Sequence, residues 1–257
     1  MKKHLLLLLV MFMTGPALLW AQNTRPVKVK IQRYKAEKCV RKTACVKMLL
    51  NWPVLSGGNA RAVEAINDSI RNMVYFSAEA DPSLPLPRAL DTSMVYAYAM
   101  LKDQIAGMDD FGMSYEYELE SKVLLQNQRY ISIAMSNYSF IGGAHPNTYV
   151  LFGTYDLQTG RQVRLEEVIP DTLTLRSMLE KAFIQEKTEE GQPAPALSDI
   201  LFEEYQSLPM PLNFAVTTEG VEFYYNPYEV AAYVFGPTDI LFTWEQLGRL
   251  ADKARWQ

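Results

Sequence analysis

Hydrophobic and polar residues alternate along several stretches of the chain, which is the pattern of strands that are buried on one face. Near the start, Val27, Val29 and Ile31 alternate with Lys28 and Lys30. Turn residues separate neighbouring stretches, so several of these strands are expected to form hairpins. The strands predicted in this way cover residues 27–31, 44–50, 115–120, 130–135, 149–155, 162–165, 214–217, 221–225 and 239–243.

Apolar residues recur at helical spacing in three other stretches, each with one apolar face. The first helix covers residues 60–76, the second runs from a cap at Asp91 or Thr92 to Gly107 or Gly112, and the third begins at a cap of Asp171 or Thr172. A proline-rich linker at residues 81–87 is expected to separate the first two helices. Residues 244–250 are expected to form a terminal helical turn.

Antiparallel strands beside helices predict an α+β fold. A chain of 257 residues is long enough for one large domain or two smaller ones. We expect two packed modules of antiparallel sheet with about three amphipathic helices, an N-terminal module at residues 22–148 and a C-terminal module at residues 149–257. No internal repeat interrupts this division.

Residues 1–21 have the organisation of a secretory signal peptide. Lys2 and Lys3 give a positive start, the run Leu5–Phe12 is apolar, and Ala21 offers a small residue before a cut. The alternative is a retained membrane anchor, but the apolar run is at the short limit for crossing a bilayer. We therefore expect an exported protein, periplasmic or surface-associated and secreted, with no transmembrane segment in the mature chain.

Composition and charge exclude several classes of protein. The chain is 49% hydrophobic and 21% charged, which is typical of a globular protein rather than a disordered one. Its formal net charge is −4, and no run of basic residues stands out. Because phosphate contacts supply most of the affinity for nucleic acids, a nucleic-acid partner is not expected.

The two cysteines, Cys39 and Cys45, lie on either side of a predicted hairpin turn. In an oxidising compartment such a pair is most simply a disulfide, worth about 2 kcal/mol on the chain-entropy estimate. Redox catalysis and metal binding remain as alternatives. A redox site prefers two intervening residues, however, and a zinc site needs more than two thiolates.

Candidate chemistry is sparse. His145 is the only histidine after residue 21, and it lies in a turn with Gly142, Gly143 and Pro146. We predict a structural role for this turn, with a general base or a ligand contact as the alternative. No nucleophile elbow or phosphate-binding loop occurs. The sequence therefore predicts no catalytic residue, no metal and no cofactor.

Glu116, Glu118 and Glu120 form the densest set of carboxylates. Alternate residues of a strand are about 6.5–7 Å apart, a separation within the range of inverting glycosidases. Any solvated acidic strand has the same spacing. We therefore predict a solvent-facing row, paired with basic residues such as Lys28 and Lys30 on another strand.

Three groups of residues together resemble a known family. They are Trp52-Pro53 to Ile70 with Glu64-Ala-Ile-Asn67, the turn Ile141–Asn147, and a C-terminal group of Tyr155–Gly160, Leu165–Val168 and Phe223–Val230 through Gly236-Pro237. The chain resembles the extracytoplasmic pair of domains of unknown function in RsiV-type anti-sigma factors, which sense lysozyme. The first of these domains also accompanies the catalytic domain of PdaC-type peptidoglycan deacetylases.

The resemblance implies a binding role without a catalytic residue to transfer, because neither a sigma-binding segment nor a deacetylase domain is expected in this chain. The predicted function is non-enzymatic binding of a cell-envelope ligand, either a lysozyme-like protein or peptidoglycan. The alternative is a glycan-acting hydrolase or transferase that would use Glu116, Glu118 and His145.

The predicted partner-binding surface is a tyrosine-rich loop near the C-terminus. Pro227 fixes its own φ and lacks an N–H, so the chain is expected to leave the preceding strand there. Rigid tyrosines are common anchors in interfaces. The alternative is that Tyr228 fills the core of its own module. The predicted surface consists of Asn226, Pro227, Tyr228, Glu229 and Tyr233.

Overall fold

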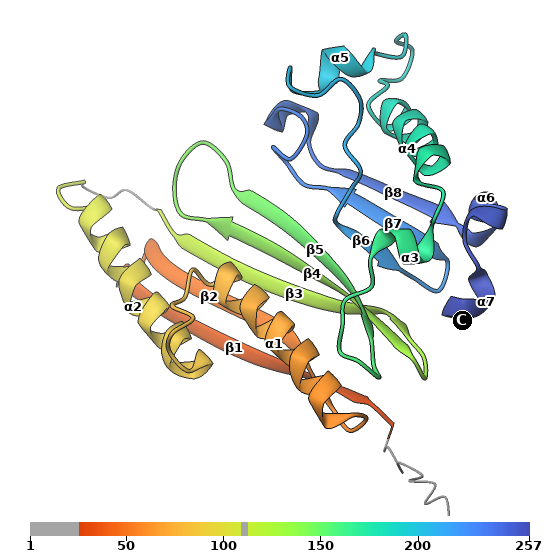
Figure 1. Cartoon of the computed structure of the whole chain (residues 1–257). Coiled ribbons are helices and arrows are strands. Elements are labelled where there is room, and N and C mark those ends of the chain that lie inside the picture. Colours follow the sequence, from red (N-terminus) through yellow and green to blue (C-terminus); the bar gives the residue numbers. More distant parts are fainter. Residues whose placement is uncertain (1–25, 109–112) are drawn as a thin grey trace, which may run out of the picture.

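The computed structural model describes residues 26–108 and 113–257, so the predicted signal peptide at residues 1–21 lies outside the described residues. Two sheets and several helices form an α+β structure (Figure 1). The larger sheet has five strands in the order β1-β2-β3-β4-β5, and the smaller has three in the order β6-β7-β8. The predicted fold class is therefore confirmed.

The strands follow the predicted alternation closely, although most are longer. They are β1 (Lys28–Arg41), β2 (Ala44–Ser56), β3 (Tyr115–Gln126), β4 (Tyr130–Phe140), β5 (Asn147–Asp156), β6 (Phe214–Val216), β7 (Gly220–Tyr225) and β8 (Thr238–Thr243). The strand predicted at residues 162–165 is wrong. Only Gln162 makes a bridge, to Tyr155, and the chain then turns into a short helix at Leu165.

Three longer helices match the three predicted ones: α1 (Ala60–Ser77), α2 (Leu86–Gln104) and α4 (Thr172–Glu186). Asp171 caps α4 as predicted, since its side chain accepts a hydrogen bond from the N–H of Thr174. The start of α2 was predicted too late, at Asp91 or Thr92. It begins directly after Pro85 and contains Pro87 in its first turn, where a missing N–H costs no intrahelical bond.

The remaining helices are single turns. They are α3 (Leu165–Val168), α5 (Leu197–Ile200), α6 (Trp244–Leu247) and α7 (Lys253–Trp256), with 3₁₀ turns at Tyr233–Phe235 and Gly248–Leu250. Among the helices of the described residues, none combines the length and the hydropathy needed to cross a membrane.

The five-stranded sheet is mixed, which corrects the prediction of purely antiparallel modules. β2 and β3 are parallel, with Val46 opposite Tyr115, whereas the other neighbouring pairs are antiparallel. The reason is the connection between them: α1 and α2 carry the chain back along the sheet, so that β3 starts at the same end as β2.

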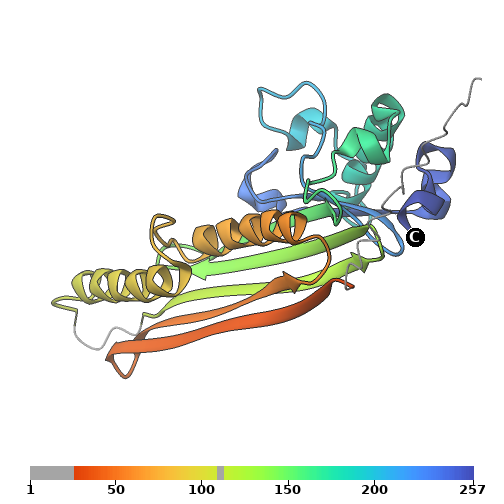
Figure 2. The same cartoon turned by 60° about the horizontal axis from the view of Figure 1, so that its bottom comes forward.

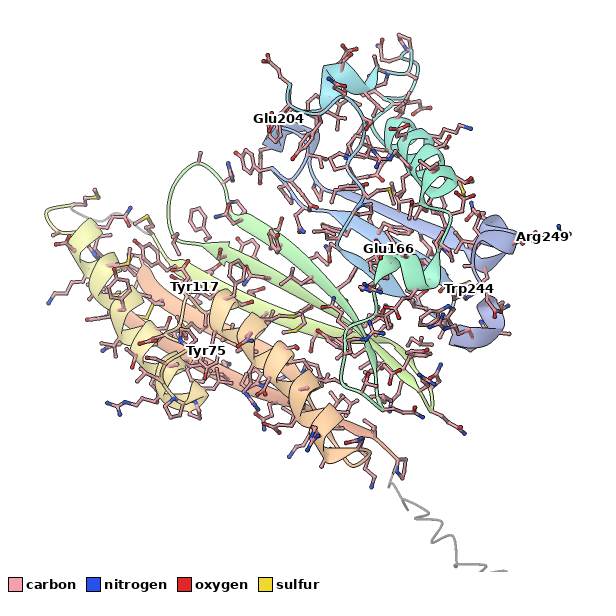
Figure 3. The ribbon with its side chains drawn as sticks, viewed as in Figure 1. Tyr75, Tyr117, Glu166, Glu204, Trp244 and Arg249 are labelled. Atoms are coloured by element: carbon pink, nitrogen blue, oxygen red, sulfur yellow. A yellow bond between two sulfur atoms is a disulfide. The ribbon has the colours of Figure 1, made fainter. Side chains whose placement is uncertain are left out.

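Both connecting helices cover the same face of this sheet (Figure 2). Ile66 and Ile70 of α1 pack on Leu50 and Leu119, in a core that continues to Ile133. A second cluster lies under α2 and includes the buried Tyr117, labelled in Figure 3. Alternate residues of each strand therefore point away from the helices.

The acidic row of β3 lies on that opposite face, as predicted, with Glu118 and Glu120 exposed. The predicted basic partners are wrong, however. Glu116 pairs with Lys47 of the adjacent β2, at 3.3 Å between Nζ and Oε1. Lys28 and Lys30 lie on β1, which β2 separates from β3.

The smaller sheet and α4 enclose a separate core. Leu175, Leu179 and Phe183 of α4 pack on Phe223 and Tyr225 of β7. The strand β5 crosses the boundary predicted at residues 148–149, and it pairs with β4 from Asn147 to Asp156. The larger sheet therefore extends to Asp156.

Two asparagine side chains join the smaller sheet to the outer edge of β5, the side that faces away from β4. Asn226 accepts a hydrogen bond from the N–H of Val150 at 2.8 Å and donates to the carbonyl of Val150 at 3.1 Å. Asn213 accepts from the N–H of Phe152 at 2.7 Å and donates to the carbonyl of Val150 at 2.8 Å. These side chains take the place of a neighbouring strand, so the edge of β5 is closed.

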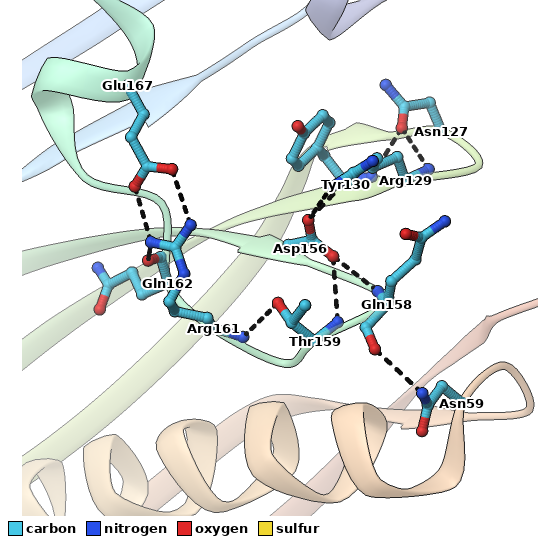
Figure 4. Close-up of polar contacts among 10 residues, drawn as sticks. All are labelled: Asn59, Asn127, Arg129, Tyr130, Asp156, Gln158, Thr159, Arg161, Gln162 and Glu167. Atoms are coloured by element: carbon cyan, nitrogen blue, oxygen red, sulfur yellow. Dashed lines mark hydrogen bonds and ion pairs between the residues drawn. The ribbon is translucent and has the colours of Figure 1, made fainter.

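The turn after β5 is held by charged and polar contacts on both sides (Figure 4). Asp156 binds Arg129 at 2.9 Å and accepts hydrogen bonds from the N–H groups of Gln158 and Thr159. Gly160 has φ +76, and a Cβ there would lie 2.7 Å from the carbonyl oxygen of Ala62. This turn, predicted from its glycine, is thus pressed against the start of α1.

Cys39 and Cys45 form the predicted disulfide, opposite each other across β1 and β2. With Glu37 they make the only group of three metal-binding residue types found in the described part of the chain. Because the two sulfur atoms are bonded to each other, neither is free to bind a metal.

Candidate functional site

A groove of about 270 Å³ lies between the two modules, where α1, β4 and β5 meet the loop after β7. We call it the aromatic groove. Its lining residues are Phe76, Ser77, Glu79, Asn137, Ser139, Asn147, Thr148, Tyr149, Pro227, Tyr228 and Tyr233.

Two tyrosines that line the aromatic groove, Tyr228 and Tyr233, form a cluster of three rings with His145 of the other module. His145, from the turn between β4 and β5, lies flat against Tyr233, with ring centroids 3.8 Å apart and planes 16° apart. The rings of Tyr228 and Tyr233 also pack together, with their centroids 5.4 Å apart. Nδ1 of His145 lies 2.9 Å from the carbonyl oxygen of Pro146. The histidine turn and the tyrosine loop, which the sequence presented as separate features, therefore form one structure.

Two more rings line the groove. Phe76, in the last turn of α1, is 62% exposed, and its ring lies edge-on to that of Tyr149 with centroids 6.0 Å apart. Burial raises the pKa of Tyr149, with a further contribution from the charge of Glu229. The Tyr149 phenol therefore remains a neutral hydrogen-bond donor at physiological pH.

Two residues of the groove, Glu79 with φ +49 and Tyr228 with φ +64, are the only non-glycine residues with positive φ in the described segments. Glu79 follows the end of α1, where its N–H bonds to the carbonyl of Phe76, so its conformation is that of a helix C-terminus. At Tyr228, in a turn, positive φ costs free energy, and such strain is found at binding sites. The Tyr228 turn is held by Glu229, whose carboxylate accepts a hydrogen bond from the N–H of Asn226 at 2.8 Å. The backbone that carries Tyr228, a tyrosine that is 56% exposed, is thus held in one conformation.

The structure divides the predicted partner-binding residues into two groups. Pro227, Tyr228 and Tyr233 line the aromatic groove. Asn226 is only 4% exposed and is committed to the edge of β5, so it is not available to a partner, and Glu229 is half-buried beside it. The predicted glycine turn has φ +90 at Gly142 and φ +101 at Gly143.

Other groove residues were not identified from the sequence. Phe76 is the last residue of the helix predicted at residues 60–76, and Glu79 lies just beyond it. Asn137 and Tyr149 lie at strand positions without a distinctive motif. Only the exposure of an aromatic residue marks such a site, and exposure is not visible in the periodicity.

The acidic row is not part of this groove. In the register of β3 and β4, Asn137 is opposite Leu119 and therefore shares the helix-covered face. Glu116 and Glu118 lie on the other face, so the carboxylates considered for catalysis are not brought into the groove. Glu79 is the only carboxylate among the lining residues.

A second hollow, of about 320 Å³, lies between the two sheets and contains Glu120, Lys122, Glu222 and Asp239. Burial raises the pKa of Glu222, and the charge of Asp239 raises it further. Burial also raises the pKa of Asp239. Glu222 and Asp239 therefore lie in one hollow, where the charge of one disfavours ionisation of the other.

Two successive regions of the chain match known protein families. Residues 39–148 match the family model described as "Deacetylase PdaC", and residues 171–245 match the model described as "Protein of unknown function (DUF3298)". No curated protein matches the chain.

Two crystal structures share the fold over nearly the whole chain. A member of the DUF3298 family from Bacteroides fragilis is 17% identical with a TM-score of 0.68, covering 90% of this chain and 95% of that one. A DUF3298 family protein from Pseudomonas aeruginosa is 16% identical with a TM-score of 0.54, covering 89% and 96%. At this identity the likeness establishes the fold alone.

Proposed function

We propose that this chain, which pairs a PdaC-type domain with a DUF3298 domain, is an exported, non-enzymatic binding module of the cell envelope. Its binding site is the aromatic groove, and its ligand is the glycan of peptidoglycan. The observation that carries the proposal is the set of exposed or partly exposed rings around one groove: Phe76, Tyr149, Tyr228 and Tyr233.

The chemistry of a glycan fits this arrangement. A sugar ring has C–H groups on its faces and hydroxyl or acetamido groups around its edge. The faces pack on aromatic rings, which combine a large apolar surface with a polar tip in tyrosine. Asn137, Asn147 and Ser139 offer amide and hydroxyl groups for the edge of the sugar.

The size of the groove favours a glycan over a lysozyme-like protein. A stable protein interface covers about 800 Å² on each partner. A hollow of about 270 Å³ is smaller than most drug-binding pockets and matches one or two small rings. We therefore assign the groove to a sugar. The experiment below also tests whether a lysozyme-like protein binds.

One observation supports binding rather than hydrolysis at the aromatic groove. The groove lining contains a single carboxylate, Glu79, whereas glycoside hydrolysis uses two. The disulfide Cys39–Cys45 is compatible with an oxidising compartment outside the cytoplasm.

The test is calorimetric titration of the protein with soluble peptidoglycan fragments and with N-acetylglucosamine oligomers. Tyr228→Ala should weaken binding about tenfold or more, because it removes a fixed stacking surface. Tyr228→Gly should do the same while relieving the strain at positive φ, so a loss of binding cannot be attributed to unfolding. Tyr96→Ala is the matched control, since Tyr96 is 65% exposed on α2, outside the groove.

A panel of lysozymes is titrated in parallel. If a lysozyme binds saturably and both Tyr228 variants retain that binding, the groove assignment is wrong and a protein partner binds elsewhere. Absence of saturable binding to any glycan fragment at high micromolar concentration would contradict the proposal, as would turnover of a fragment by the wild-type protein.

A further inference from the structure

The strand β1 forms a long open edge of the five-stranded sheet. It pairs with β2 along its full length, from Lys28 opposite Ser56 to Arg41 opposite Ala44. Among the described residues, no strand pairs with its other side. Figures 1 and 2 show β1 at the border of the sheet, away from the smaller sheet. An unpaired strand edge is a template for another extended chain.

The opposite border of the same sheet is treated differently. There the side chains of Asn213 and Asn226 bond to the backbone of Val150 and Phe152, so the edge of β5 is occupied. Within the described residues, the protein thus closes one edge of its larger sheet with its own side chains and leaves the other edge unpaired. The strand β1 contains no proline, and its one register shift lies at its end, between Cys39 and Arg41.

The open edge is strongly basic, although the whole chain has a net charge of −4. The strand contains six basic residues, Lys28, Lys30, Arg33, Lys35, Lys38 and Arg41, and one acidic residue, Glu37. The basic residues were inconspicuous in the sequence because other residues separate them. They are brought together only when the strand places them along one border of the sheet, on both of its faces.

Three of these basic residues are engaged within the protein. Arg41 donates to the carbonyl oxygens of Ile105 and Met108, Arg33 donates to Asn51, and Lys38 lies over the ring of Tyr98. The other three, Lys28, Lys30 and Lys35, are exposed and have no acidic partner among the described residues. Lys28 and Lys30 lie on one face of β1 and Lys35 on the other.

The charge decides what kind of strand fits. A second copy of β1 would place lysine and arginine opposite lysine and arginine, and like charges that face each other across strands are destabilising. An acidic extended segment would instead form ion pairs on both faces while its backbone completes the hydrogen-bond ladder. Ile31, which is 50% exposed, adds one apolar contact between the lysines.

We propose that the free edge of β1 binds an extended acidic peptide segment by β-strand addition. The favoured partner has acidic side chains opposite Lys28, Lys30 and Lys35 and an aliphatic side chain opposite Ile31. The Cys39–Cys45 disulfide closes one end of the β1–β2 hairpin, beyond the three exposed lysines. This surface is distinct from the aromatic groove and does not depend on the function proposed for it.

The probe is a fluorescent peptide of about eight residues, long enough to span Lys28 to Lys35, with glutamate at the three positions opposite the lysines and valine opposite Ile31. Fluorescence anisotropy should show saturable binding that weakens as salt is raised. Two N-methylated versions carry methyl groups on alternate amide nitrogens. Because alternate N–H groups of a strand point in opposite directions, only one version should lose binding, by about tenfold or more.

Charge reversal on the protein provides the second measurement. The variant Lys28→Glu/Lys30→Glu should abolish binding of the peptide. The control Lys181→Glu/Lys253→Glu changes the net charge equally at exposed sites on α4 and α7, and it should bind like the wild type. Heparin serves as an anion that cannot form a ladder.

The proposal is overturned if the peptide does not bind, or if both N-methylated versions bind as tightly as their parent. The second result would mean attraction by charge alone. Binding of heparin with no binding of the peptide would equally overturn it. None of these outcomes changes the glycan titrations of Tyr228 variants, so the two proposals fail separately.

Discussion

Glu167 and Glu222 carry the same carboxyl group, but their neighbours shift its pKa in opposite directions. The Arg161 guanidinium binds both oxygens of Glu167 at 2.7 Å and holds its pKa at about 2 (Figure 4). Glu222 lies in the hollow between the sheets, where burial and then the charge of Asp239 raise its pKa. Neither difference is visible in the sequence, because both depend on residues brought together by the fold.

Glu167→Gln should reduce stability at neutral pH. A carboxylate with a lowered folded-state pKa stabilises the protein above its unfolded pKa, near 4.3, and this stabilisation is lost as the pH falls toward about 2. Since the Arg161 side chain is 54% exposed, the loss is about 1 kcal/mol at pH 7. Urea unfolding at pH 7 and at pH 3 should show the difference from wild type shrinking with acidity.

Glu166→Gln is the control for this measurement, because the neighbouring Glu166 is exposed and forms no ion pair among the described residues (Figure 3). It should have the stability of the wild type at both pH values. If Glu167→Gln has the stability of the wild type at pH 7, the ion pair stabilises Arg161 no more than hydration by water does.

Glu222→Gln should have the opposite effect. A carboxyl group whose folded-state pKa is raised favours folding while it is protonated, and its contribution declines as the pH rises through that pKa. At pH 7 the substitution removes a buried charge beside Asp239, so the melting temperature should rise by about 2 °C or more. At pH 4 the gain should disappear. Glu204→Gln, at an exposed position, should leave the melting temperature unchanged at both pH values.

At the scale of helices and strands, local patterns in the sequence were sufficient for most elements. The alternation in residues 115–120 and 130–135 predicted β3 and β4, and the capping residue Asp171 predicted the start of α4. Periodicity says nothing about strand direction, so the parallel pairing of β2 and β3 was missed. The prolines at the start of α2 were interpreted as part of a linker, because proline is common both in linkers and in the first turn of a helix.

The β1–β2 hairpin gives a prediction at this scale. Replacing both cysteines, with Cys39→Ser/Cys45→Ser, should lower the free energy of unfolding by about 2 kcal/mol, because the cross-link no longer restricts the unfolded chain. Hydrogen exchange should accelerate most in β1 near Lys38 to Arg41, the part of the hairpin that the disulfide closes.

Reducing agent is the control, since it should destabilise the wild type and leave the serine variant unchanged. Alkylation of unreduced protein followed by mass spectrometry should show neither cysteine modified. Equal sensitivity of both proteins to reducing agent would contradict a stabilising disulfide.

At the scale of the whole molecule, the site exists only because the two modules are docked. The sequence predicted a turn at Gly142–Pro146 and a tyrosine loop at Pro227–Tyr233, each from local composition. Their contact, with His145 stacked on Tyr233, depends on packing between residues nearly ninety positions apart. No periodicity reports such contacts, so the sequence located two halves of a groove without joining them.

The docking itself depends on the two asparagines that bond to β5. Replacing both, with Asn213→Ala/Asn226→Ala, leaves the N–H and C=O groups of Val150 and the N–H of Phe152 without these partners. Each buried group left unbonded costs about 1–3 kcal/mol. The cost falls on the contact between the two cores, since each core keeps its own apolar packing. We therefore expect calorimetry to show two melting transitions in the variant where the wild type has one.

Asn67→Ala is the matched control, because Asn67 is also buried and binds both backbone groups of a single residue, Leu55, at 2.8 and 2.9 Å. This contact lies within the larger module, between α1 and β2. The substitution should lower the melting temperature by a similar amount while the unfolding remains a single transition. Because the groove needs both modules, glycan binding should weaken in the double asparagine variant and persist in Asn67→Ala below its melting temperature. A single transition in both variants would show that the apolar contact of Ala134, Phe152 and Ala215 is sufficient to hold the modules together.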